Sequence, residues 1–393
     1  MNVPKLRFKE FDGEWEESKL SNLLVKIEEK ATDTTKGVVL TSSRTGLFPR
    51  SEYFNGREEK DIEGYSIVPK NTFTYRQMSD DNTFHINYNT KYDLGLVSPE
   101  YPVFKTNNFL TDEYFLNYIN NSPRFKKHCV LQKKGGTRTR LYFKVLGELV
   151  IAKPSIEEQK KIGDFFNLLN KKIQLQQQKI DLLQEQKKGY QFKLLNNPDW
   201  KEIRLGDYAE IRGRLGWKGL KQEEYVEKGA YLIAGKHITR GNIFWDKCDQ
   251  ITIERYEESI EIALKENDII FSKDGSLGNP AFIKCMPGKA TINSTMMLVR
   301  VSEKDKLDSK FVYHILNSNI FRKLIHLKVS GSSIPHLFQA DMKEFTFSVP
   351  SDIRTQKKIS HIFDIIDKEI DLAYKKLDLL KLQKQGFMQQ MFI

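Results

Sequence analysis

The chain has 393 residues, of which 39% are hydrophobic and 29% charged, and its 63 Lys and Arg against 52 Asp and Glu give a formal net charge of +11. This apolar content is enough for folded cores and excludes a mostly disordered chain, and the length predicts two or three domains. The basic balance favours an anionic partner such as nucleic acid. Three scattered cysteines argue against a disulfide framework and against a zinc site.

Nothing in the sequence predicts a membrane location. Residues 1–11 are polar and basic and lack the apolar core of a signal peptide. No stretch approaches the roughly 18 uninterrupted apolar residues that a transmembrane helix needs. We therefore expect a soluble, cytoplasmic protein with no membrane partner.

The first globular segment, residues 1–153, contains short β-rich runs such as residues 64–68, with Gly, Asn and Pro between them. Residues 124–144 hold eight Lys and Arg and no acid. A small-residue loop at 135–137 lets backbone N–H groups approach phosphates, and a nearby Arg can donate two hydrogen bonds to the edge of a guanine. A solvated basic face is the alternative interpretation. The predicted DNA-binding residues of this segment are Arg124, Lys126, Lys127, Lys133, Lys134, Gly135, Thr137, Arg138 and Arg140.

Residues 154–196 predict one long helix of about 40 residues, or about 60 Å. Ser155 begins it as an N-cap, with Glu158 three residues later as the partner in a capping box. Apolar residues recur every 3.5 positions on average, which is the seam of a coiled coil. The predicted helix-pairing residues are Ile162, Phe166, Leu169, Ile173, Ile180 and Leu183.

The second globular segment, residues 197–349, has β-like runs at 268–271 and 344–349. Residues 309–340 form a second acid-free basic stretch, with a small-residue loop at 331–333. A Gly-rich patch at 212–219 is as consistent with a turn around a core Trp as with a DNA-contact loop. The predicted DNA-binding residues of this segment are Arg212, Arg214, Lys218, Arg322, Lys323, Lys328, Ser332, Ser333 and His336.

Residues 350–393 predict a second long helix with the same seam. Two ordinary amphipathic helices packed on separate domains are the alternative. The predicted pairing residues are Ile359, Phe363, Ile366, Ile370, Leu377 and Leu380.

The two halves of the chain repeat each other with a period near 196 residues. Between residues 159–195 and 356–392, 15 of 37 positions are identical. If the two helices share a seam, they must be antiparallel. The helix at 154–196 leads from the first globular segment to the second, so the helix at 350–393 has to run back toward the first segment. The expected fold is therefore α+β: two duplicated mixed domains separated by two long antiparallel coiled-coil helices, with pseudo-two-fold symmetry.

Searches for catalytic and metal-binding motifs find none. The sequence has neither a phosphate-binding P-loop nor an H-E-x-x-H motif. Residues 197–200 (NPDW) and 98–101 (SPEY) lack the second Pro of the amino-methyltransferase motif. The tripeptide at 158–160 (EQK) is suggestive of a nuclease, but its place at a helix start favours a structural role.

Taken together, these features resemble a specificity subunit of a Type I restriction–modification system over essentially the whole chain. The family's recurring junction is a Gly/Ser loop, a Leu, a β-like run, then Pro and E-Q-x-x-I. The first copy has Gly135-Gly136, Leu141, Pro154, Glu158-Gln159 and Ile162. The second has Gly331-Ser332, Leu337, Pro350, Gln356 and Ile359, with Thr355 in place of the Glu.

This resemblance implies a non-catalytic subunit in which residues 1–153 and 197–349 are target-recognition domains, each reading half of a bipartite double-stranded DNA target. The helices would set the unread spacer and carry two modification subunits, which bind S-adenosylmethionine; restriction and motor subunits would join them. No cofactor is expected on this chain. A self-contained DNA methyltransferase or nuclease and a coiled-coil adaptor without a DNA role remain as alternatives.

Overall fold

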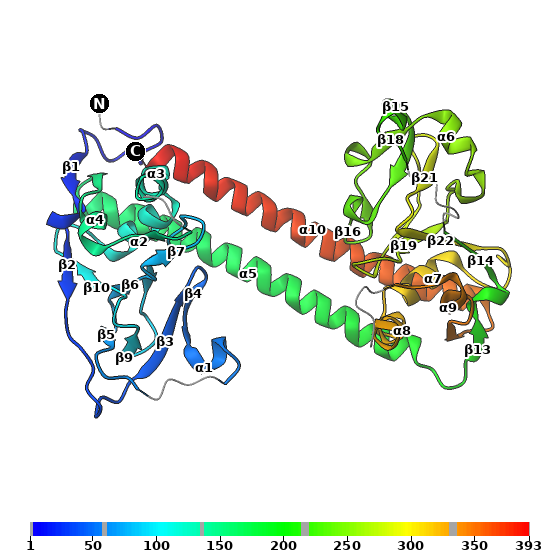
Figure 1. Cartoon of the computed structure of the whole chain (residues 1–393), viewed down its shortest axis with the longest axis horizontal. Coiled ribbons are helices and arrows are strands. Elements are labelled where there is room, and N and C mark those ends of the chain that lie inside the picture. Colours follow the sequence, from blue (N-terminus) through cyan, green and yellow to red (C-terminus); the bar gives the residue numbers. More distant parts are fainter. Residues whose placement is uncertain (1–2, 57–60, 134–136, 214–219, 330–335, 393) are drawn as a thin grey trace. The chain divides into compact units, whose positions relative to one another are not determined.

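A computed structural model describes residues 3–56, 61–133, 137–213, 220–329 and 336–392 (Figure 1). All three small-residue loops singled out from the sequence fall at least partly between these ranges. Six predicted DNA-binding residues therefore lie outside the described residues: Lys134, Gly135, Arg214, Lys218, Ser332 and Ser333.

The chain forms two compact units, and each long helix contributes to both. Unit 1 comprises residues 1–176 and 376–393, and unit 2 comprises residues 177–375. Each long helix is therefore divided between the two units, and each part belongs to the globular domain on which it packs. The domain boundaries at 153, 196 and 349 stay a prediction, because they divide the chain by segment rather than by contact.

The described residues of unit 1 combine small sheets with short α-helices. The strand pairs and sheets are β1 (Glu16–Lys19) with β12 (Val150–Lys153); β2 (Leu24–Ile27), β10 (Val103–Thr106), β6 (Phe73–Thr74) and β8 (Asn87–Tyr88); β4 (Gly46–Pro49), β3 (Val38–Ser43), β9 (Leu94–Val97) and β5 (Ser66–Pro69); and β11 (Thr139–Arg140) with β7 (Met78–Ser79). The helices are α1 (Arg50–Tyr53), α2 (Asp112–Asn121), α3 (Pro123–Leu131) and α4 (Phe143–Gly147). β3 and β9 pair in parallel, and the other strand pairings among the described residues of this unit are antiparallel.

Unit 2 repeats part of this plan. Its sheets are β13 (Lys201–Arg204) with β23 (Thr346–Val349); β14 (Ala209–Gly213), β22 (Met296–Val301), β19 (Ile269–Ser272) and β20 (Gly278–Phe282); β18 (Asp249–Ile251), β15 (Tyr225–Ile233) and β21 (Ala290–Ile292); and β16 (Ile238–Thr239) with β17 (Asn242–Ile243). Its helices are α6 (Ile253–Glu257), α7 (Ser309–Leu316), α8 (Asn319–Val329) and α9 (Gln339–Lys343). The strands predicted near residues 66, 269 and 346 are confirmed.

The duplication seen in the sequence is also a structural one, and it extends from the long helices into the main sheets. In both units a two-stranded pair, β1–β12 or β13–β23, joins the first strand of the unit to the strand that precedes the long helix. The helix pairs α2–α3 and α7–α8 also correspond. The four-stranded sheets β2-β10-β6-β8 and β14-β22-β19-β20 have the same order and antiparallel pairing, whereas strand and loop lengths differ and β5 is an additional strand of unit 1. The expected fold class of two duplicated α+β domains is therefore confirmed.

The long helices are α5 (Ile156–Leu195, 40 residues) and α10 (Ile353–Met391, 39 residues). In unit 1 the rings of Phe166 on α5 and Phe392 just after α10 stack with centroids 5.4 Å apart. In unit 2 Gln184 on α5 donates to the Tyr374 hydroxyl on α10 at 2.9 Å. Within each unit, therefore, the end of one helix lies beside the start of the other, and the two segments run antiparallel. Among the described residues, neither these nor any shorter helix combines the length and hydrophobicity needed to cross a membrane.

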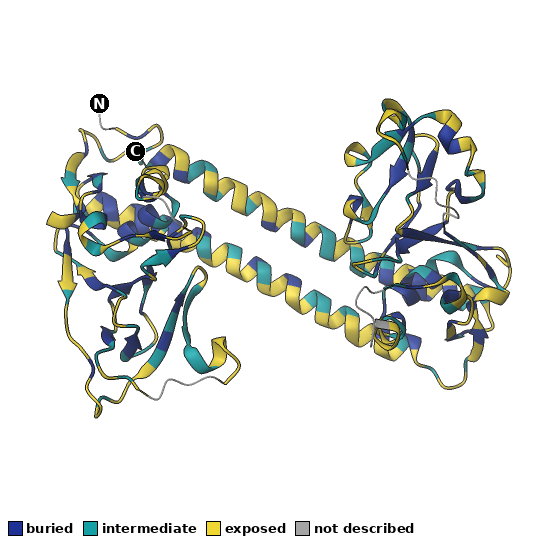
Figure 2. Cartoon of the chain, viewed as in Figure 1, coloured by how far each residue is buried: buried dark blue, intermediate teal, exposed yellow. Residues whose placement is uncertain are grey.

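Buried and exposed residues alternate along both long helices (Figure 2), and the predicted pairing residues are all buried or half-buried. Those at the helix starts are buried in the globular cores: Ile162, Phe166 and Leu169 in unit 1, and Ile359 and Phe363 in unit 2. Toward the middle of the helices, Ile180 and Leu377 are buried, and the other four are half-buried: Ile173, Leu183, Ile366 and Ile370. Leu380 is half-buried against the core of unit 1. The seam thus packs against the globular domain as well as against the other helix.

A buried glutamine holds the first turn of each long helix to its domain. Gln159 donates from Nε2 to the carbonyls of Pro154 (3.0 Å) and Phe109 (3.1 Å), and its Oε1 accepts from the N–H of Thr111 (2.9 Å). Gln356 makes the same three bonds, to Pro350 (2.9 Å), Lys306 (3.0 Å) and the N–H of Asp308 (2.9 Å). Thr111 and Asp308 are the N-caps of α2 and α7, so each amide joins two helix starts.

Of the two hydrogen bonds of the capping box predicted at the start of α5, one is formed and the prediction of the other is wrong. The Ser155 hydroxyl accepts from the N–H of Glu158 at 3.3 Å, as predicted. The Glu158 carboxylate instead pairs with Arg7, through Nε at 2.8 Å and Nη2 at 2.7 Å. In α10, where Thr355 replaces the Glu, Asp352 accepts from the N–H groups of Arg354 and Thr355. An inserted Asp therefore caps the second helix, and the loss of the Glu is compensated locally.

We predict that Gln159→Leu and Gln356→Leu each weaken one unit. Each substitution leaves three buried backbone groups without partners, which costs about 2–5 kcal/mol of unfolding free energy. Hydrogen–deuterium exchange should accelerate in α2 for the first variant and in α7 for the second. Gln174→Leu, an exposed position on α5, is the control. Equal acceleration in the control would contradict the role of the buried amides.

Candidate nucleic-acid and partner surfaces

The predicted basic residues of unit 1 lie on α3 and around β11. Arg124, Lys126 and Lys127 are exposed on α3, and Lys133, Thr137, Arg138 and Arg140 are exposed beyond it. The run is free of acid in sequence but not in space. Arg138 Nε donates to Asp80 Oδ1 at 2.9 Å, and Arg124 lies 3.9 Å from Glu17. Among the described residues, Lys126, Lys127, Lys133 and Arg140 form no ion pair with a carboxylate, although Arg140 hydrogen-bonds with Tyr142 and the charge of Glu100 acts on it.

The basic residues of unit 2 are more strongly paired. Arg322 and Lys323 are exposed on α8. Lys328 pairs with Asp341 at 2.7 Å, and Arg212 on β14 pairs with Glu210 at 3.1 Å. The His336 ring contacts the Asp274 carboxylate. Lys328 and His336 thus contact carboxylates that are distant in sequence, which a local charge count does not detect, whereas the partner of Arg212 is only two residues away.

Exposed apolar side chains accompany these cations at equivalent positions of the two units. Leu131 is the last residue of α3, Leu327 lies in the last turn of α8, and Tyr142 and Phe338 follow the two loops; all four are exposed. Aromatic rings and aliphatic groups beside a basic surface suit contacts with nucleic-acid bases. These four residues were not predicted from the sequence, because the prediction rested on the positions of charged residues. A signal was available, since a Leu and an aromatic residue recur at equivalent positions of the two repeats.

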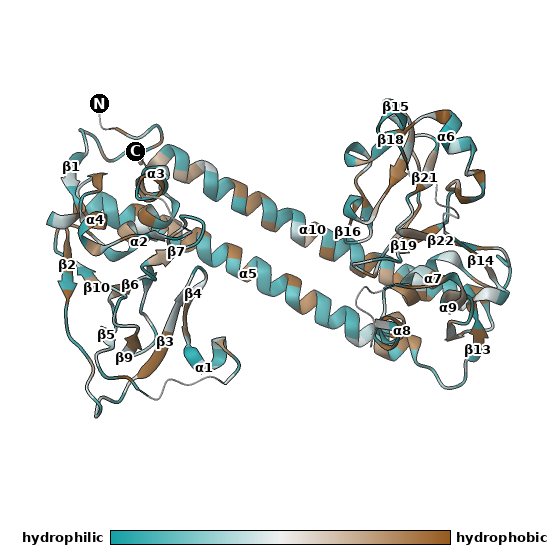
Figure 3. Ribbon diagram, viewed as in Figure 1, coloured by the Kyte–Doolittle hydropathy of each residue, from teal (hydrophilic) through white to brown (hydrophobic). Residues whose placement is uncertain are grey.

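A second apolar stripe, exposed to solvent, recurs on both long helices, along which hydrophobic and hydrophilic bands alternate in Figure 3. It is formed by residues at intervals of seven that are 49% to 61% exposed: Leu168, Leu175 and Leu182 on α5, and Ile365, Leu372 and Leu379 on α10. These positions correspond in the duplication, and the next heptad ends each stripe with a glycine, Gly189 or Gly386. A Cβ at either glycine would meet no atom within 4 Å. The pairing residues predicted from the sequence do not include these positions, because the stripe lies on another face of each helix.

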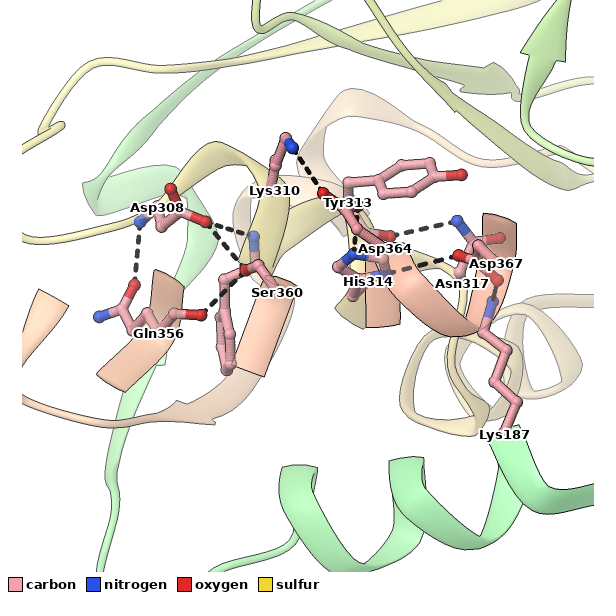
Figure 4. Close-up of polar contacts among 11 residues, drawn as sticks. Lys187, Asp308, Lys310, Tyr313, His314, Asn317, Gln356, Ser360, Asp364 and Asp367 are labelled. Carbon is pink, nitrogen blue, oxygen red and sulfur yellow. Dashed lines mark hydrogen bonds and ion pairs between the residues drawn. The ribbon is translucent and has the colours of Figure 1, made fainter. Parts of the chain in front are cut away.

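An ionic cluster attaches both helices to the core of unit 2 (Figure 4). The buried His314 ring on α7 lies between Asp364 and Asp367 of α10, at 3.2 Å and 3.9 Å. Lys310 is 2.5 Å from the other Asp364 oxygen, and Lys187 on α5 is 2.5 Å from Asp367. Burial disfavours the Asp364 carboxylate, but hydrogen bonds from His314 and Lys310 outweigh it and hold its pKa well below the ordinary value.

Unit 1 builds the corresponding contact from aromatic rings. Tyr114 and Tyr118 stand where unit 2 has Lys310 and His314. Both rings contact Phe392, with centroids 5.4 Å and 5.5 Å apart. Burial raises the pKa of both tyrosines, so they stay neutral. The two copies therefore use different chemistry at the same place in the fold.

No group of three His, Cys, Asp or Glu side chains is placed to hold a metal ion within the described parts of the chain. Cys129 is buried, Cys248 is half-buried and Cys285 is exposed, and all three are free thiols. Burial raises the pKa of the Cys129 thiol to about 12, and that of Cys248 to about 11. Neither of these two thiols is poised to react as a thiolate near neutral pH.

Comparison with known proteins identifies the same pattern. Residues 12–185 and 197–382 match the family model described as the Type I restriction modification DNA specificity domain. The MjaVIII specificity subunit of Methanocaldococcus jannaschii is 22% identical over 319 residues, covering 75% of this chain and 72% of that protein. A putative type I specificity subunit of Mycoplasma pneumoniae is 24% identical over 265 residues, covering 65% and 67%.

Solved structures show the same fold. The S subunit of a Type I restriction–modification system from M. genitalium superposes with a TM-score of 0.62 at 14% identity, covering 100% of this chain and 99% of that one. A chain from a structural study of the assembly of a type I R-M system gives a TM-score of 0.56 at 13% identity, covering 96% and 97%.

The ionic cluster predicts a pH-dependent stability of unit 2. Because the folded pKa of Asp364 lies below its ordinary value of 3.8, its stabilisation is present above that value and is lost as pH falls through the lower folded pKa. Asp364→Asn should accelerate exchange of α7 amides at pH 7, by a destabilisation of about 1–3 kcal/mol. The difference from the unmodified chain should shrink below pH ~3.8.

Asp378→Asn is the matched control, since Asp378 is exposed on the same helix and has no ion-pair partner within the described ranges. A difference between Asp364→Asn and the unmodified chain that is independent of pH would contradict the electrostatic origin of the effect.

Proposed function

Because the chain belongs to the Type I restriction–modification DNA specificity family, we propose that units 1 and 2 each recognise one half of a bipartite double-stranded DNA target. The chain is the DNA-recognition component of such a system and is not itself an enzyme. It contributes specificity, whereas methyl transfer and cleavage belong to partner subunits.

One observation carries the assignment of a half-target to each unit. Exposed cations recur at equivalent positions of the shared scaffold, Lys126 and Lys127 on α3 and Arg322 and Lys323 on α8. Beyond that scaffold the sequences and the loop lengths differ between the units. A shared basic surface suits the DNA backbone, which is the same everywhere, and divergent loops suit two different base sequences.

The proposed DNA contacts keep the residues predicted from the sequence. The cations without a carboxylate partner within the described ranges, such as Lys133 and Arg140, are the more direct phosphate contacts. Those paired with an acid, such as Arg138 and Lys328, must exchange that partner on binding DNA. The loop residues outside the described ranges remain part of the proposal on their chemistry alone.

The long helices are proposed to set the unread spacer and to carry two modification subunits. The exposed stripes of α5 and α10 support this role, because apolar residues at heptad spacing favour packing against another helix. Two equivalent stripes suit two copies of one partner. Each modification subunit would bind S-adenosylmethionine, and restriction and motor subunits would join the assembly.

The function is tested by mapping adenine methylation across a host genome that carries the partner subunits, with this gene present and deleted. Deletion should abolish methylation at one bipartite motif and leave other motifs unchanged. An unaltered methylome, with the partners shown to be expressed, would overturn the proposal. Binding of S-adenosylmethionine by the isolated chain would instead favour a self-contained methyltransferase.

The stripes are tested by Leu175→Asp on α5 and Leu372→Asp on α10. An acid in an apolar contact should weaken binding of a modification subunit at least about tenfold, since losing one well-packed anchor costs about 2 kcal/mol. Each single variant should retain one modification subunit in place of two, measured by native mass spectrometry, and the double variant none.

Gln178→Asp and Gln385→Asp introduce the same acid at other exposed positions of the two helices and should retain both subunits. Full assembly by the double Leu variant would show that the stripes do not hold the modification subunits.

A further inference from the structure

Unit 2 contains a cavity of about 700 Å³ bordered by α5, α10, α7 and the turn between β16 and β17. Its lining carries seven Lys and Arg against three Asp. The cations are Lys187, Lys188, Arg240, Lys284, Lys310, Arg322 and Lys368, and the acids are Asp364, Asp367 and Asp371. The cavity is therefore strongly basic.

The three carboxylates of the lining are already paired. Asp364 and Asp367 hold Lys310 and Lys187, and Asp371 pairs with Lys375 at 2.9 Å. Lys188 pairs with Glu185 at 2.7 Å, outside the cavity lining. Four cations remain without a carboxylate partner among the described residues: Arg240, Lys284, Arg322 and Lys368.

Arg240 is held in place by an aromatic contact. Its guanidinium lies over the Tyr374 ring, 3.9 Å from the centroid, and the Tyr374 hydroxyl accepts a hydrogen bond from Gln184. The β16–β17 turn, α10 and α5 therefore meet at this point. The contact orients the guanidinium without neutralising its charge.

The junction itself does not require charged side chains, because unit 1 has Asn167 and Asn170 where unit 2 has Asp364 and Asp367, and Tyr114 where unit 2 has Lys310. Two of the four unpaired cations of unit 2 have basic counterparts in unit 1, Lys126 for Arg322 and Lys171 for Lys368. Four uncompensated cations around one cavity repel one another, and a bound anion would relieve that repulsion.

We propose that this cavity binds the phosphodiester backbone of DNA on the spacer side of the half-target recognised by unit 2. The inference rests on the proposed function. DNA is favoured over a small anion because Arg322 on the cavity wall adjoins Lys323, which is exposed on α8, so the positive surface continues beyond the cavity. The two long helices also border the cavity, and they are the elements proposed to span the unread base pairs. Phosphate contacts there position the duplex and read no sequence.

The test is the double variant Lys284→Ala with Lys368→Ala, assembled with its modification subunits. Each lost phosphate contact should make the slope of log affinity against log salt less steep by about 0.9, so the pair should change it by about 1.8. Affinity should fall by the same factor for target and non-target DNA, and the methylated motif should not change. Lys228→Ala with Lys265→Ala, two exposed lysines of unit 2 away from the cavity, is the control.

Three results would overturn the inference. The first is an unchanged salt slope, and the second is a changed motif, which would mean base reading. The third is protection of Lys284 and Lys368 from chemical acetylation by inorganic phosphate or ATP but not by DNA, which would indicate a small-anion site. A complex that methylates no specific sequence even without substitutions would instead refute the proposed function, which distinguishes the two failures.

Discussion

The buried amide at the first turn of each long helix is the contact on which the rest of the structure depends. Gln159 and Gln356 are both fully buried, and each satisfies three backbone groups from two other segments. An amide suits this place because it carries both donors and an acceptor and needs no counter-charge. Each helix therefore leaves its domain in a defined direction, whatever sequence the outer strands and loops have.

That shared junction allows the remaining surfaces to diverge. At the neighbouring contact, unit 1 uses the rings of Tyr114, Tyr118 and Phe392, whereas unit 2 uses His314, Lys310 and two aspartates. Apolar packing is insensitive to pH and salt, whereas a partly buried ionic cluster is not. The two halves of one duplicated chain thus differ in how they respond to conditions, although their scaffolds correspond.

Each long helix has one apolar face that packs on its domain and a second apolar face that is exposed. Seam residues such as Phe166 and Phe363 are buried in the globular cores, whereas Leu175 and Leu372 remain exposed on the outside. Because both sets repeat every seven residues, they stay on their own faces along the whole helix. A partner helix can therefore occupy the outer stripe without disturbing the contact between the helix and its domain.

The sequence by itself determined the duplication, the two long helices and the α+β character of the domains, because heptad spacing and helix start signals are local properties of the chain. It also located the exposed cations of α3 and α8. Only the tertiary structure decided which charges are neutralised, since Arg138 meets Asp80 and His336 meets Asp274 across long stretches of sequence. The cavity beside Arg240 likewise depends on elements that are far apart in sequence, and no local pattern specifies which residues such elements bring together.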